Sequence, residues 1–466
     1  MELELPITIK DCHGFIKKLF IIINGQSKIA EEQSKRLLRL EQENNDLKEL
    51  LGRNSKNSSK PPSSSENKNK STRTPSGKST GGQKGHKGSC RALLDEKYVD
   101  KIVYCNTPKK CSCGGNIYLK QDYLRHQVHE LPCIKLDVTE YRLAKGKCSC
   151  CGKKHIADLP EGIGWGITGY KLTSFMSSLV SRYQLSRRDL KDFLKEHLNF
   201  NISLGTVFNK EKIVVKSLEE VTNNLLVSIK DSPFIHIDET GHKRDGKKEW
   251  MWSVSSKESV YFAILKSRGK KAMKSLVGDY EDIVISDRYS VYNHFENRQF
   301  CWAHLKRDFV KLSEKKDKPL SRIGKELLKE TSLLFEKWHK FKSGSFSREI
   351  LILECKSIIK KTGELLEQVS YSAPELKASR FAKNLLERFD SLWTFLYNDS
   401  IEPTNNQAER CLRKSVIWRK KYFTTRSEIG DLFVSRTASV IGTCRLQLKN
   451  SNEYLTEIVR RHFVTV

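Results

Sequence analysis

Three carboxylates stand in sequence settings that suit chemistry on a phosphodiester. Asp238 closes the apolar run 234–237, and Asp287 closes the run 283–286. Glu409 lies in a polar segment that opens a predicted helix. Carboxylates held at strand ends can point into a cleft, and Mg²⁺ prefers such oxygen ligands. Each aspartate alone is equally well explained as a turn former, but the three together predict a hard-cation site.

The elements around these residues predict a mixed α/β domain. Period-two runs indicate strands, with a polar hairpin at 244–248 and a helix at 270–278; the strands span 234–238, 250–255, 260–266 and 283–287. Asp238 is expected to end the first strand and Asp287 the fourth. Three strands in hairpin order, a helix and a fourth strand follow the order of a ribonuclease-H-like core.

The interval before Glu409 is too long for one connection. Residues 311–400 carry Leu, Ile and Phe at helical spacing, which predicts a helical insertion. The catalytic core is therefore expected in two parts, 232–310 and 401–466.

Charge favours a polyanionic partner. The 466 residues include 84 Lys+Arg against 56 Asp+Glu, a formal net charge of +28. Nucleic acid fits this excess best, although membrane-surface and ribosomal proteins share it. The N-terminus lacks the basic region of a signal peptide, and the apolar run 19–23 is too short to span a bilayer. We expect a soluble, cytoplasmic protein without membrane contact.

Residues 1–52 are predicted to contain a leucine-zipper-like helix at 26–51. Leu40 and Leu47 occupy d positions, and the a positions are Ala30, Leu37, Asn44 and Leu51. Asn at an a position favours a parallel, in-register dimer. The alternative is an amphipathic helix packed on its own protein.

Residues 53–95 form a basic low-complexity arm. From Arg53 to Gly88 nine Lys/Arg stand against one acid, Glu66. A segment with so few apolar residues cannot build a core, and it is either a linker or an arm lying along DNA phosphates. The candidate DNA contacts are Arg53, Lys56, Lys60, Lys84 and Lys87.

Residues 96–160 are predicted to form a zinc-finger-like domain. Cys148 and Cys151 belong to a C-x-x-C-G motif, and Cys111 and Cys113 lie upstream in a C-x-C pair. Two thiolate pairs separated by a β-prone segment suit a tetrahedral Zn²⁺ site. Cys105 is an alternative upstream ligand and Cys150 is also available. Buried small cysteines are the alternative explanation.

Two further segments are candidate DNA contacts. Residues 161–231 predict short helices with an N-cap at Ser203, typical of a helix-turn-helix or of generic helical packing; Arg187 and Arg188 are the contacts expected there. Near Glu409 the basic residues that could brace phosphates are Arg410, Arg413, Lys414, Arg419 and Lys420. His304 either contacts the scissile strand or is a core histidine.

Motifs along nearly the whole chain resemble the bacterial transposases of the insertion sequence 66 family, within the DDE superfamily. The zipper-like helix and the cysteine motifs are part of this resemblance. The other motifs that carry it are Gly52-Arg53-Asn54-Ser55-Lys56, Gly81-Gly82-Gln83-Lys84-Gly85-His86, Asp238-Glu239-Thr240, Ser286-Asp287, Cys301-Trp302-Ala303-His304, Asn405-Asn406-Gln407-Ala408-Glu409-Arg410 and Trp418-Arg419-Lys420. The C-x-C pair and Ser65-Glu66 depart from the family pattern.

This resemblance implies a transposase with the catalytic triad Asp238, Asp287 and Glu409. It implies binding of element ends and Mg²⁺- or Mn²⁺-dependent strand cleavage and strand transfer. The partners would be terminal inverted repeats and target DNA, further copies of the chain in a homodimer or larger assembly, and accessory proteins of the same element, in the bacterial nucleoid. The alternatives are an inactive, domesticated DNA-binding regulator and a zinc-dependent RNA-binding protein, for which the sequence lacks aromatic stacking surfaces.

Overall fold

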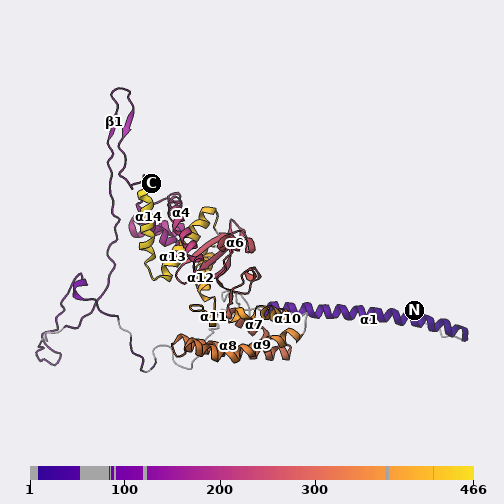
Figure 1. The fold of residues 1–466 in the computed structure, drawn as a ribbon. Helices are drawn as coiled ribbons and strands as arrows, with labels where there is room; N and C mark the ends of the chain where they lie inside the picture. The colour runs from indigo at the N-terminus through magenta and orange to yellow at the C-terminus, as the bar shows by residue number, and fades with distance from the viewer. Residues whose placement is uncertain are drawn as a thin grey trace. The chain divides into compact units, whose positions relative to one another are not determined.

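The computed structural model describes residues 9–52, 83, 85–88, 91–118, 123–372, 377–422 and 425–465 (Figure 1). The larger of two compact units includes residues 143–190 and the described residues from 203 onward, and the smaller includes 91–118, 123–142 and 191–202. Within the described residues, no helix has the length and apolar character needed to cross a bilayer.

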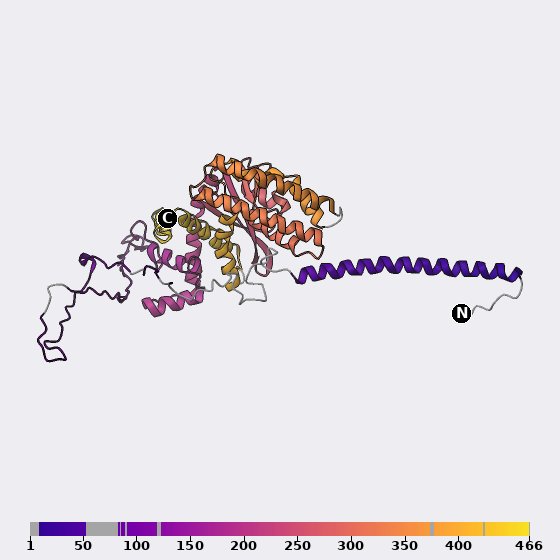
Figure 2. The ribbon, with the colours of Figure 1, turned by 90° about the horizontal axis from the view of Figure 1, so that it is seen from below.

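The N-terminal helix α1 runs from Ile9 to Leu51, longer than predicted (Figure 2). The heptad phase of its C-terminal half continues upstream, with Ile16 and Ile23 at a positions and Leu19 at a d position. More than half of the Ile16, Ile23, Leu40 and Leu47 surfaces is exposed. The helix thus presents an apolar stripe along most of its length.

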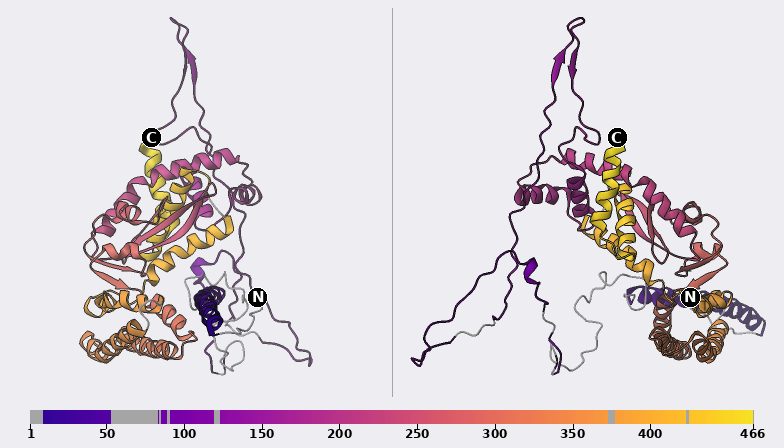
Figure 3. Two further views of the ribbon diagram at one scale, coloured as in Figure 1. Left: turned by 90° about the vertical axis from the view of Figure 1, so that its right-hand side faces the viewer. Right: turned by 60° about the vertical axis from the view of Figure 1, so that its left-hand side comes forward.

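A five-stranded mixed sheet forms the centre of the larger unit (Figure 3). Its strands are β3 (Phe234–Arg244), β4 (Lys247–Ser255), β5 (Val260–Leu265), β6 (Ile283–Ser286) and β7 (Arg298–Phe300). They lie in the order β5-β4-β3-β6-β7; β3 pairs antiparallel with β4 and parallel with β6, and β7 continues the parallel half. The mixed α/β prediction is confirmed; β7 was not predicted.

Strand β3 corrects one expectation, because Asp238 does not end it. The strand continues to Arg244, paired with β4 throughout that stretch. Its parallel pairing with β6 stops at His236, opposite Ile285. Asp238 therefore lies where β3 loses one neighbour, not at the strand terminus. The hairpin then turns at Asp245-Gly246, both with positive φ (48° and 77°), as a tight two-residue turn requires.

Alternating side chains of the sheet supply two cores. Trp252 and Val254 point to a core with Ile235 and Met273, under helix α6 (Lys270–Val277). Met251 points to the opposite face. There it packs with Phe262 and Leu412, beneath α12 (Asn406–Tyr422) and α13 (Glu428–Leu446).

Helix α13 covers the edge of β5 through hydroxyl groups. The backbone N–H of Val260 donates to Thr443 Oγ1 (3.0 Å), and that of Phe262 donates to Ser439 Oγ (2.8 Å). Gly442 permits this approach, since a Cβ there would lie 2.5 Å from Val260 Cγ1. This edge of the sheet, formed by β5, is therefore satisfied within the chain and is not left as a template for pairing.

The predicted insertion is helical, and its helices begin earlier than expected, at Trp302. They are α7 (Trp302–Ser313), α8 (Lys318–Lys342), α9 (Arg348–Ser372), α10 (Lys377–Leu386), the 3-10 turn η4 (Phe389–Leu392) and α11 (Thr394–Tyr397). They share a core with Phe234 and Phe300 of the sheet. The Trp302 Nε1–H donates to the carbonyl of Leu392 (2.7 Å), which joins the two ends of the insertion.

Ahead of the sheet lie four helices. They are α2 (Tyr170–Ser181), α3 (Arg187–Leu198), α4 (Leu204–Ser217) and α5 (Glu219–Lys230). Ser203 caps α4 by accepting the Thr206 N–H, as predicted. Helix α2 packs on α14 (Ser451–Thr465). Whether this region reads DNA as a helix-turn-helix stays a prediction.

Short elements precede these helices along the chain. They are η2 (Glu96–Tyr98) in the smaller unit, and the hairpin of β1 (Lys145–Lys147) with β2 (Lys154–Ile156) in the larger.

Candidate active site

Asp238 and Asp287 lie in matching positions on adjacent parallel strands. Because His236 pairs with Ile285, each aspartate stands two residues beyond the last parallel pair. Both are half-buried. Burial raises the pKa of Asp238 well above its ordinary value, and the charges of Glu239, Asp287 and Glu409 raise it further. The three carboxylates predicted from the sequence thus lie close enough to interact.

The loop after β6 holds Asp287 by hydrogen bonds. Asp287 Oδ1 accepts the Tyr289 N–H at 2.8 Å. The carbonyl of Asp287 and the hydroxyl of Ser286 accept from Arg298 Nη2, at 2.8 and 3.0 Å. Arg298 is 1% exposed, and its other terminal nitrogen donates to Asn293 Oδ1 at 2.8 Å. This buried guanidinium fixes the backbone that carries Asp287.

Asn405 places the start of α12 against β3. Its Nδ2 donates to the carbonyl of Ile237 (3.0 Å), which leaves its Oδ1 facing His236 Nδ1 at 2.9 Å. Because an amide oxygen can only accept, His236 Nδ1 must carry the proton of this hydrogen bond. Burial lowers the pKa of His236 to about 4, keeping the ring neutral. The carbonyl of Asn405 accepts the Glu409 N–H, which sets Glu409 in the first turn of α12.

Glu409 carries a carboxylate oxygen with no hydrogen bond. Its Oε1 is buried and has no hydrogen-bond partner among the described residues, and neither has His304 Nδ1. The two atoms are 3.6 Å apart, and Arg307 Nη2 lies 3.6 Å from the same oxygen. Burial and then Arg307 lower the pKa of His304. His304 therefore borders the carboxylates and does not belong to a separate core.

Cys301, His304 and Glu409 also bring potential ligand atoms within 4.8 Å of one another. Burial raises the pKa of the Cys301 thiol to about 11, so the thiolate that binds metals is disfavoured. Its sulfur already accepts the Asn405 N–H at 3.1 Å. The all-carboxylate set therefore suits a cation better than this mixed set, and the oxygen ligands suit a hard divalent ion.

A buried network behind the aspartates was missed by the sequence reasoning. Glu239 accepts from Arg268 (2.7 Å to Nη2) and from the hydroxyl of Tyr292. Arg268 also stacks on Tyr289, 3.9 Å from the ring centroid. The Asp238-Glu239 pair was visible as a motif, but no sequence signal distinguished Arg268 or Arg298 from the many other basic residues.

The cysteine motifs each form a local turn. Around Cys111, the Gly114 N–H donates to the Cys111 carbonyl (2.9 Å), and the Gly152 N–H does the same for Cys148 (3.0 Å). Backbone N–H groups of Cys113 and Cys151 lower the pKa of the Cys111 and Cys148 thiols, respectively. Both turns thus favour thiolates; a shared Zn²⁺ site stays a prediction.

The predicted DNA contacts differ in how free their side chains are. Arg53, Lys56, Lys60 and Lys84 lie outside the described residues. Exposed side chains are those of Lys87, Arg188, Arg410, Arg413 and Lys420. Three others have partners inside the protein: Arg187 binds both oxygens of Glu211, Lys414 donates to the Arg182 carbonyl, and Arg419 donates to Thr240 and Gly241 of β3.

Relatives of this chain have been found among bacterial proteins. An uncharacterized protein of Sinorhizobium fredii, y4hP, is 25% identical over 240 residues, which is 44% of this chain and 40% of the relative. A second from the same organism, y4qI, is 22% identical over 280 residues, 52% of this chain and 50% of the relative. The matched stretches span at most half the length of these relatives.

Family models match two parts of the sequence. Residues 22–92 match a family of unknown function (DUF6444). Residues 175–431, which carry all three carboxylates, match the Transposase IS66 family. Because that match covers more than half of the chain, the protein belongs to the IS66 family of transposases.

Proposed function

We propose that this chain is a DDE transposase that binds the ends of an insertion sequence and catalyses strand cleavage and strand transfer. The observation that carries the proposal is the matching position of Asp238 and Asp287, each two residues beyond the last parallel pair of β3 and β6, within reach of the Glu409 charge from α12. The strand order β5-β4-β3-β6-β7 supports a ribonuclease-H-like core, with the helices α7 to α11 inserted before α12.

Asp238, Asp287 and Glu409 would hold Mg²⁺ or Mn²⁺. The buried Glu409 Oε1 without a hydrogen bond and the raised pKa of Asp238 both indicate a site that gains from a cation. Divalent ions bound there would activate a water or 3′-hydroxyl and stabilise the leaving oxygen.

The chain's own residues would hold the DNA. Arg307 lies beside Glu409, and Arg410 and Arg413 are exposed on α12. Such guanidinium groups can bind phosphates bidentately. Asn405 and Arg298 orient the acids through the backbone contacts described above.

The direct test is end cleavage by the full-length protein on duplexes carrying the element's own termini. We expect nicking at the element boundary with Mg²⁺ or Mn²⁺ and none with EDTA. Binding without cleavage under either metal would instead indicate the inactive, domesticated regulator.

Zinc content gives a separate prediction. Cys148 and Cys151, with two of Cys111, Cys113 and Cys105, should hold one Zn²⁺ per chain. Elemental analysis should find one zinc, and Cys148→Ser should remove it while the mixed sheet stays folded. Cys355→Ser, on α9, is the matched control and should keep the metal. Purified wild-type protein that contains no zinc would contradict the prediction.

Self-association should depend on α1. The stripe from Ile16 to Leu47 suits a parallel dimer, which would supply two active sites for two element ends. Leu40→Pro should break the helix and reduce paired-end complexes more than single-end binding. Lys35→Ala, an exposed residue off the seam, should change neither.

The same helix offers a test of orientation. Cys12 falls at a d position in the continued heptad phase. In a parallel, in-register pair the two Cys12 side chains face each other, so mild oxidation should link two copies through Cys12. Peptide mapping that finds Cys12 unlinked in a protein that still dimerises would rule out this register.

A further inference from the structure

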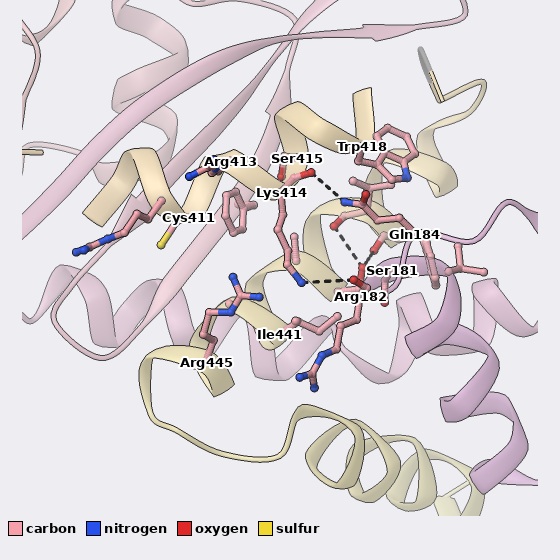
Figure 4. Close-up of a pocket in the computed structure, with 18 of the residues that line it drawn as sticks. Ser181, Arg182, Gln184, Cys411, Arg413, Lys414, Ser415, Trp418, Ile441 and Arg445 are labelled. Atoms are coloured by element: carbon pink, nitrogen blue, oxygen red, sulfur yellow. Dashed lines mark hydrogen bonds between the residues drawn. The ribbon is translucent and has the colours of Figure 1, made fainter. Parts of the chain in front are cut away.

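A pocket of about 400 Å³ lies beside α12 (Figure 4). On α12, Arg410, Lys414 and Trp418 line it at helical spacing, and the other walls come from α13 and the segment after α2. Glu409 is not part of its lining. One helix thus carries both Glu409 and one wall of this pocket.

The floor of the pocket is aromatic and aliphatic. Its lining includes Phe262, Phe433, Trp418 and Ile441, all of which are largely buried. Flat apolar groups pack well on such surfaces. The volume lies in the range of pockets that enclose small organic ligands, about 300–1,000 Å³.

The rim is basic, and none of the described residues that line it is acidic. Figure 4 shows Lys414 reaching from α12 toward the backbone of Arg182, with Arg445 of α13 nearby. Lys414 Nζ is 3.4 Å from the Arg182 carbonyl oxygen. Burial, then repulsion from Arg445 and Arg182, lowers the pKa of Lys414. These cations lack a carboxylate between them, so an anionic ligand would relieve their repulsion.

The geometry points to a subsite for one unstacked nucleotide of the bound DNA strand, with its base on the apolar floor and its phosphate against Lys414 and Arg445. An apolar floor beneath a cationic rim matches the two halves of a nucleotide, and aromatic side chains stack on any base. This inference rests on the proposed function and specifies how the same helix would hold its substrate.

The pocket and Glu409 lie on one helix, which limits the nucleotides that can reach the pocket. The body of a helix is about 10 Å across, and bases along one strand are spaced by about 3.4 Å. We therefore expect the base in the pocket to come from within about three positions of the scissile phosphate. Extruding a base at that point would hold the strand end in a fixed register for the reaction.

Photocrosslinking tests the inference directly. Duplexes with the element's own ends carry 5-iododeoxyuridine at one terminal position at a time and are bound to full-length protein in EDTA. We expect crosslinks from one position, within about three of the cleavage site, to an aromatic residue of the pocket, identified by mass spectrometry.

Two variants separate the pocket from general DNA binding. Ala438→Leu, on the pocket wall, should abolish this crosslink while the duplex stays bound. Arg445→Gln should weaken DNA binding and lower the slope of log affinity against log salt concentration by about one unit, the amount expected for one lost phosphate contact. Arg322→Gln removes the same charge from an exposed position on α8 and should leave the crosslink unchanged.

Crosslinks that map only outside the pocket, or that survive Ala438→Leu unchanged, would overturn the subsite even if the protein cleaves DNA. A protein that cleaves with neither metal would overturn the proposed function. The crosslink in EDTA would still report on the pocket in that case, so the two failures are distinguishable.

Discussion

Replacing Asp287 by Asn should abolish metal-dependent end cleavage while DNA binding persists. The amide keeps an oxygen that can accept the Tyr289 N–H, so the loop after β6 should hold its shape. What is lost is the negative charge that the proposed metal site would use beside Asp238 and Glu409. Substituting a residue that hydrogen-bonds to a metal ligand commonly lowers metal affinity or activity by about 10–100-fold. Removing a ligand itself should therefore lower the cleavage rate by at least about 100-fold.

The comparison requires a matched carboxylate outside the cluster. Asp279 is exposed and pairs with Lys274 at 2.5 Å. Asp279→Asn removes the same charge from the surface and should cleave at nearly the wild-type rate, because exposed ion pairs contribute little. Glu409→Gln and Asp238→Asn should behave as Asp287→Asn does. Cleavage at the wild-type rate by any of the three would remove that residue from the catalytic assignment.

The sequence was informative wherever burial alternated along a strand or a cap opened a helix. In β4 the run 250–255 places Met251 and Trp252 on opposite faces, and this alternation identified the strand. Ser203 marked the start of α4 because a side-chain oxygen is needed for the free N–H groups of a helix. Such signals are local, so no tertiary information was required.

Other features depended on contacts between distant segments. The second half of β3, from Glu239 to Arg244, is polar and resembles a loop, but its pairing with β4 keeps it extended. The three residues of β7 include buried Arg298 and Gln299, which composition would place at the surface. Asp238 and Asp287 could be predicted as strand-associated acids, whereas the in-register pairing of β3 with β6 could come only from the fold.

Arg298 illustrates how a residue invisible to sequence patterns can position the site. It is buried, and its terminal nitrogens bond Asn293, Ser286 and the backbone carbonyl of Asp287. Burial lowers its pKa to about 10, which leaves it charged at neutral pH. The hydrogen bonds to this guanidinium therefore offset much of the cost of burying the charge.

Arg298→Met should destabilise the core and impair cleavage together. Methionine fills the stem of the side chain but removes the hydrogen bonds donated to Asn293, to the buried Ser286 hydroxyl and to the Asp287 carbonyl, which should cost about 2–4 kcal/mol of unfolding free energy. Arg298→Lys can reach some of these acceptors and should fall between Met and wild type. Arg322→Met, on an exposed residue of α8, should stay within about 0.5 kcal/mol of wild type by denaturant unfolding.

If Arg298 positions Asp287, the same variants should show a second effect. If the guanidinium holds Asp287 in place, Arg298→Lys should need about tenfold more Mg²⁺ for half-maximal cleavage, measured at a temperature where it is fully folded. Loss of stability alone would lower the amount of active protein without changing that concentration. An unchanged Mg²⁺ dependence in a folded Arg298→Lys protein would show that Arg298 stabilises the sheet and has no part in placing the carboxylate.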